Sequence, residues 1–234
     1  MNAASLRMDL SGLGDSRAIA KPSSSPGEPN TPRGVFDLSA AMDHLRDRYE
    51  INQFVPIGLC SGALHTHLMA ERSDQVVGAV MIDGIAFRTT GFYLRHYLFR
   101  MLFPSFWYGA IQRRRLDALP PSNPETNPAE FFYSESIGRE TASQQIRQMK
   151  RDGKRLMFVF TGGCDDVNSA AQFRSMFGVS PDQRALTMHY RAAAEHTFRL
   201  RENQIWLCKT IANWWKTHWP VERGNVAGAV VVDA

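Results

Sequence analysis

Residues 52–62 have the sequence NQFVPIGLCSG, an apolar run that leads into a glycine-rich turn. The run over 52–59 predicts a short buried strand, and the pattern over 61–72 predicts a helix. Between them, Gly58-Leu59-Cys60-Ser61-Gly62 predicts a tight strand-to-helix turn. Such a turn presses the residues two before and two after its centre against neighbouring backbone. Gly58 and Gly62 therefore place Cys60 at the centre of the turn.

A cysteine on this kind of turn is a candidate nucleophile. The amino terminus of the helix that follows favours the thiolate form of Cys60. The backbone N–H of Ser61 is a candidate donor to an oxyanion. The turn alone leaves an alternative open, because many α/β folds use glycines at such a turn with a small buried cysteine that only packs.

The segments around this turn alternate between strand-like and helix-like patterns. Beyond the turn, strands are expected over 76–82, 156–161 and 185–190, and helices over 36–49, 169–177 and 202–217. Each strand is an almost continuous apolar run. This alternation predicts an α/β fold with a mostly parallel sheet covered by helices on both faces.

The alternation breaks over residues 87–153. This stretch begins with many aromatic residues, continues with Arg113, Arg114 and Arg115, and then becomes rich in Pro and Asn. We interpret it as an inserted helical lid between two parts of a core, 1–86 and 154–220. Packing of its aromatics on the core is favoured over an acyl pocket or contact with a membrane surface. Residues 221–234 form a tail for which the sequence predicts no element.

Composition excludes several classes of protein. The chain has 234 residues, 44% of them hydrophobic and 21% charged, as in ordinary globular proteins. Its three cysteines lack paired spacing, which argues against a zinc site or a disulfide framework. A net charge of +4 does not favour nucleic acid as a partner. No signal peptide and no membrane-spanning stretch is visible, so a cytoplasmic location is expected.

No cofactor or metal is expected either. Gly12-Leu13-Gly14 has Arg17 where a dinucleotide-binding loop needs its third glycine. His65 and His67 lack the i, i+4 spacing of a helical metal site, so they are interpreted as ordinary helix residues.

Several motifs follow one another in a characteristic chain order. They are Arg7-x-Asp9-x-x-Gly12-x-Gly14-x-Ser16, the Cys60 turn, Gly163-Cys164-Asp165-Asp166 and Glu195-His196-Thr197-Phe198. Nucleophile, acid and histidine in this order resemble the α/β-hydrolase fold superfamily. The branch that looks most similar is the one called serine aminopeptidase-like or exosortase-associated hydrolases.

The resemblance implies a catalytic role for each matching residue. Cys60 aligns with the nucleophile, His196 with the general base, and Asp165 or Asp166 with the acid that orients the base. The implied activity is hydrolysis of an ester, thioester or related small acyl substrate through an acyl-enzyme. A non-catalytic accessory or binding protein on the same scaffold is the alternative. Complete members carry further strands before the Arg7 motif, so the first strands are expected to be missing and an edge near 6–10 to be exposed.

Overall fold

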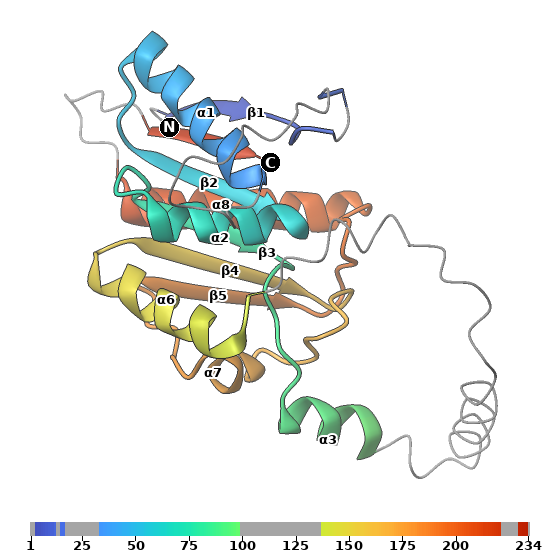
Figure 1. The fold of residues 1–234 in the computed structure, drawn as a ribbon. Coiled ribbons are helices and arrows are strands. Elements are labelled where there is room, and N and C mark those ends of the chain that lie inside the picture. Colours follow the sequence, from blue (N-terminus) through green and yellow to red (C-terminus); the bar gives the residue numbers. More distant parts are fainter. Residues whose placement is uncertain (1–2, 13–14, 17–32, 99–136, 221–228, 234) are drawn as a thin grey trace, which may run out of the picture.

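A computed structural model describes residues 3–12, 15–16, 33–98, 137–220 and 229–233. Its strands are β1 (Ala3–Arg7), β2 (Phe54–Leu59), β3 (Gly78–Ile82), β4 (Arg155–Thr161), β5 (Leu186–Arg191) and β6 (Ala229–Asp233). They form one sheet in the order β1-β6-β2-β3-β4-β5, and all neighbouring strands are parallel (Figure 1). The prediction of a parallel α/β sheet is confirmed.

Helices cover both faces of the sheet. One face carries α1 (Arg33–Tyr49), α2 (Ser61–Arg72), α6 (Arg139–Arg151) and α7 (Gln172–Phe177), and the other carries α8 (Arg201–His218) (Figure 1). Side chains alternate between the two faces along a strand. In β4, Phe158 and Phe160 accordingly pack in the core beneath the first group of helices, whereas Met157 and Val159 pack in the core beneath α8.

Helix α2 begins directly after Cys60 and is fixed at its other end by a buried lysine. The Nζ of Lys154 donates to the carbonyl oxygens of Ala70 at 2.6 Å and Ser73 at 2.8 Å. These bonds satisfy carbonyls at the end of the helix that have no partner within it. Burial lowers the pKa of Lys154. Lys154 thus fixes the carboxyl end of α2, the helix that follows the predicted elbow, at the beginning of β4.

The carboxyl-terminal tail, for which we predicted no element, contributes strand β6 (Ala229–Asp233). β6 lies between β1 and β2, with Ala3 paired to Ala229 and Phe54 paired to Val230. The strand near residues 6–10 is not wholly unpaired, because β1 (Ala3–Arg7) pairs with β6, but among the described residues β1 is the outermost strand and its other side is an edge of the sheet.

The predicted lid is only partly described. Helix α3 (Thr90–Leu98) extends away from the sheet in Figure 1, whereas residues 99–136, which include Arg113, Arg114 and Arg115, lie outside the described residues. Helix α6 falls within the expected lid range of 87–153 but buries Ala142, Ile146 and Met149 in the core. Residues 139–151 therefore pack as part of the core layer. Within the described residues, no helix is long and apolar enough to cross a membrane.

Candidate active site

The candidate residues gather at the carboxyl ends of the central strands. Cys60 follows β2, Asp83 follows β3, Thr161 ends β4, and His196 lies in the loop after β5. Because these strands are parallel, all four positions lie at the same edge of the sheet, which is where α/β sheets bind their ligands. The backbone N–H of Cys60 donates to Ile82 at 2.9 Å, which ties the ends of β2 and β3 together.

The turn at Cys60 has the strained geometry that the sequence predicts. Cys60 adopts φ 58° and ψ −119°, a left-handed conformation that a residue with a side chain rarely takes. A β-carbon on Gly58 would lie 2.2 Å from the carbonyl oxygen of Gly62, so the Gly58 flank of the elbow has no room for one. Cys60 thus lies at the junction of β2 and α2, and Ser61 is the first residue of α2.

Asp83 lies beside this elbow. The next residue, Gly84, has room for no β-carbon, because one would lie 2.3 Å from the Cβ of Ala63 in α2. Asp83 itself has φ 45°, a conformation that aspartate tolerates better than most residues. The turn after β3 is therefore packed tightly against the start of the Cys60 helix.

The carboxylate of Asp83 is fully buried and hydrogen-bonded at both oxygens. Oδ1 accepts the backbone N–H of Thr161 at 2.7 Å. Oδ2 accepts the hydroxyl of Thr161 and lies 3.1 Å from Nδ1 of His196. The Asp83 side chain is 0% exposed and that of His196 is 35% exposed. An ionised Asp83 therefore holds the proton on Nδ1 and leaves Nε2 of His196 as the basic nitrogen.

The loop that carries His196 is braced by Glu195. Its carboxylate accepts the backbone N–H of Leu200 at 2.9 Å and the side-chain amide of Asn203 at 3.2 Å. Hydrogen bonds from the backbone N–H of Glu195 itself and from that of Leu200 lower the pKa of Glu195. The ionised carboxylate thus fixes the loop to the beginning of α8.

The acid predicted from the sequence differs from the acid that contacts His196. Asp166 forms an ion pair with Arg88 at 2.7 Å, and Asp165 is exposed. Both follow β4, the strand end at which the motif order suggested an acid. In the structure, the carboxylate that contacts His196 is instead that of Asp83, which follows the neighbouring strand β3. A signal for it was present in the sequence, since Asp83 directly follows a buried apolar run, as Cys60 does.

A second cysteine near this edge of the sheet, Cys164, has a thiol whose burial makes it a poor nucleophile. Cys164 lies in the turn after β4, and burial raises the pKa of its thiol to about 11. A thiol with so high a pKa is a poor nucleophile at neutral pH. Cys60 therefore remains the candidate nucleophile among the two.

Of the two histidines interpreted from the sequence as ordinary helix residues, His67 is buried in the core and His65 is half-buried. His67 is buried, and its Nε2 lies 2.9 Å from the side-chain oxygen of Gln145. The ring of His65 packs against Gly34 of α1, where a β-carbon would lie 2.6 Å from it. Across the part of the chain that the structure describes, no cluster of His, Cys, Asp and Glu could hold a metal ion.

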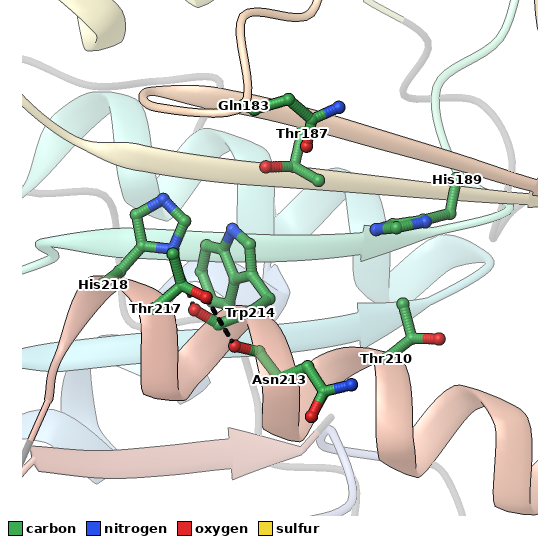
Figure 2. Close-up of a pocket in the computed structure, with 8 residues that line it drawn as sticks. All are labelled: Gln183, Thr187, His189, Thr210, Asn213, Trp214, Thr217 and His218. Atoms are coloured by element: carbon green, nitrogen blue, oxygen red, sulfur yellow. Dashed lines mark hydrogen bonds between the residues drawn. The ribbon is translucent and has the colours of Figure 1, made fainter.

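A pocket of about 230 Å³ lies between β5 and α8 (Figure 2). It is lined by hydroxyl, amide and aromatic side chains: Gln183, Thr187, His189, Thr210, Asn213, Trp214, Thr217 and His218. Burial lowers the pKa of His189. The indole Nε1 of Trp214 is buried and has no hydrogen-bond partner among the described residues. Cys60, Asp83 and His196 do not line this pocket, so it is separate from the candidate active site.

Comparison of the sequence with protein families and with curated proteins finds no match. Solved structures of similar fold include esterases and α/β hydrolases. An esterase from Pyrococcus furiosus is 15% identical, with a TM-score of 0.47 over 79% of this chain and 61% of that chain. An esterase domain from Rhodothermus marinus is 15% identical, with a TM-score of 0.48 over 82% of this chain and 71% of that chain. Mouse alpha/beta hydrolase domain-containing protein 10 is 15% identical, with a TM-score of 0.40 over 89% of this chain and 76% of that chain. The chain thus spans less than two thirds of the Pyrococcus esterase.

Proposed function

We propose that this protein is an α/β-fold hydrolase that cleaves small ester or thioester substrates through an acyl-enzyme on Cys60. The observation that carries the proposal is the contact of 3.1 Å between His196 Nδ1 and the buried carboxylate of Asp83, at the same sheet edge as the strained Cys60 elbow. In this proposal Cys60 is the nucleophile, His196 the general base and Asp83 the residue that orients the base. Asp83 takes the role that the sequence suggested for Asp165 or Asp166.

The first half of the reaction forms the acyl-enzyme. Nε2 of His196 takes the proton of the Cys60 thiol, and the sulfur attacks the carbonyl carbon of the substrate. A carbon–sulfur bond forms, and the electron pair of the carbonyl moves onto its oxygen, towards which the N–H of Ser61 donates. The tetrahedral intermediate then expels the alcohol or thiol, which receives its proton from His196.

The second half restores the thiol. Water loses a proton to Nε2 of His196 and attacks the acyl carbon. The carbon–sulfur bond breaks, the carboxylic acid leaves, and the proton on His196 returns to the Cys60 sulfur. Asp83 stays ionised throughout, because its role is to keep the proton on Nδ1 and to stabilise the imidazolium that forms.

The chemistry of sulfur sets the substrate class in this proposal. Thiolates attack esters and thioesters readily and amides less so, which favours acyl esters over peptides. A cytoplasmic site of action, expected from the sequence, suits the proposal because thiols remain reduced there. The helical lid predicted over residues 87–153 remains a proposal for the part outside α6, and packing of its aromatics on the core is still favoured over an acyl pocket.

Pre-steady-state kinetics with an activated nitrophenyl ester tests the proposal. The wild-type protein is expected to release a burst of nitrophenol equal to the enzyme concentration, and Cys60→Ala is expected to release none. Cys208→Ala is the matched control, because Cys208 is an exposed thiol on α8. Full turnover in Cys60→Ala removes Cys60 from the mechanism. Absence of both a burst and steady turnover in the wild-type protein favours the non-catalytic alternative.

A further inference from the structure

Thr161 is the residue that holds the proposed acid in place. It ends β4 and is 0% exposed. Its backbone N–H donates to Oδ1 of Asp83 at 2.7 Å, and its hydroxyl donates to Oδ2. A single residue therefore binds both oxygens of the carboxylate. Hydrogen bonds to a charged group are among the stronger ones in proteins, and a buried carboxylate depends on them.

The same hydroxyl also reaches the side of the site that carries the base. The backbone N–H of Gly163 donates to Oγ1 of Thr161 at 3.2 Å. A β-carbon on Gly163 would lie 2.4 Å from the backbone nitrogen of His196, so this glycine is pressed against the His196 loop. The Thr161 hydroxyl thus links the Asp83 carboxylate to the turn on which the His196 backbone rests.

Burial alone does not explain this arrangement. Thr66 on α2 is also 0% exposed, but its hydroxyl has no hydrogen-bond partner within the part of the chain that the structure describes. A buried threonine in this fold is thus tolerated for packing alone, whereas the hydroxyl of Thr161 is used both as donor and as acceptor.

We propose that Thr161 is a positioning residue of the active site, which acts through Asp83 to fix the orientation of the His196 imidazole; this inference rests on the proposed function. Thr161→Val keeps the shape of the side chain but removes the donor to Oδ2 and the acceptor of the Gly163 N–H. The carboxylate is then held at Oδ1 by one backbone bond and is free to turn away from Nδ1 of His196. The acylation rate is expected to fall about 10- to 100-fold, the range associated with a lost bond to a charged group. The substrate dissociation constant obtained from the single-turnover data is expected to stay the same, because Thr161 acts through Asp83.

Two measurements on four proteins test this role. The proteins are the wild type, Thr161→Val, Thr161→Ser and Thr66→Val. The first measurement is the single-turnover rate of acylation with the nitrophenyl ester. The second is the proton NMR spectrum without substrate, in which an imidazole N–H bonded to a buried carboxylate resonates far downfield. Thermal unfolding of each variant shows whether it is folded.

The downfield signal and the acylation rate are expected to be lost or reduced in Thr161→Val and restored in Thr161→Ser, which keeps the hydroxyl. Thr66→Val is expected to resemble the wild type. A folded Thr161→Val that keeps both the signal and the wild-type rate overturns the proposal. If the wild type shows neither a burst nor turnover but its downfield signal follows the Thr161 series, the reaction is wrong and the positioning of His196 by Thr161 stands.

Discussion

Replacement of Asp83 by Asn changes one carboxylate oxygen into an NH2 group and keeps the shape of the side chain. The remaining oxygen is needed by the backbone N–H of Thr161, which lies 2.7 Å from Oδ1. The NH2 group then faces Nδ1 of His196, which lies 3.1 Å from Oδ2 in the wild type. Two N–H donors cannot bond to each other, so His196 must carry its proton on Nε2 instead. The nitrogen that should take the thiol proton is thereby blocked.

The loss expected in Asp83→Asn is large. The wrong tautomer in a catalytic triad lowers kcat about 10⁴-fold, which corresponds to about 5 kcal/mol in the activation free energy. The matched controls are Asp165→Asn and Asp166→Asn. Asp165 is exposed, and Asp166 pairs with a half-exposed Arg88, so both variants are expected to stay within about twofold of the wild type.

The assay is steady-state hydrolysis of the nitrophenyl ester, with thermal unfolding as the check that each variant is folded. The assignment of Asp83 is refuted if a folded Asp83→Asn retains most of its activity. A loss of activity in Asp166→Asn or Asp165→Asn alone would return the role of the acid to the residues after β4.

Three further predictions follow from other parts of the structure. Gly58→Ala is expected to lower both the esterase rate and the Tm, because the new β-carbon would lie 2.2 Å from a backbone oxygen. The control is Gly91→Ala on α3, where the new β-carbon would meet only a flexible arginine side chain. This control should leave the rate and the Tm nearly unchanged. Iodoacetamide at pH 8 is expected to label Cys164 about 100-fold more slowly than a thiol of ordinary pKa, because burial raises the pKa of Cys164 from 9.0 to about 11. Peptide mass mapping measures the labelling rate of Cys164 relative to that of the exposed Cys208. Burial lowers the pKa of His67 from 6.5 to about 4. Between these two pH values the unfolded chain binds a proton at His67 that the folded chain does not bind. The free energy of unfolding therefore falls by about 3 kcal/mol as the pH drops from 6.5 to 4. Urea unfolding between pH 4 and 7 should show a shallower pH slope in His67→Leu, and an unchanged slope would contradict this cause.

The parts of the site that local sequence determines could be predicted. The elbow depends on two small residues at fixed spacing around Cys60, and steric crowding at Gly58 is a local property. The position of α2 over residues 61–72 follows from the same stretch, and its bounds in the structure agree. His196 could be proposed from its place after the last long apolar strand of the predicted core.

The acid could not be chosen from local pattern. Asp83, Asp165 and Asp166 all follow apolar strands, and only the lateral order of the strands and the path of each loop decide which of them meets His196. The carboxyl-terminal strand was missed for a similar reason. The partners of β6 are β1 and β2, which are remote from it in sequence, so no short-range sequence pattern predicts that β6 pairs with them.

The position of β6 between β1 and β2 also has a consequence for biosynthesis. β2 to β5 and their helices are complete long before residues 229–233 have been made, and their contacts can form while the chain is still being translated. β1 is made before β2 to β5 but cannot join the sheet until its neighbour β6 has emerged. During that interval the outer side of β2 is an open strand edge, which invites association with other chains. Until β6 has been made and has paired with β2, the nascent protein is therefore more exposed to aggregation, and more dependent on chaperones, than it is afterwards.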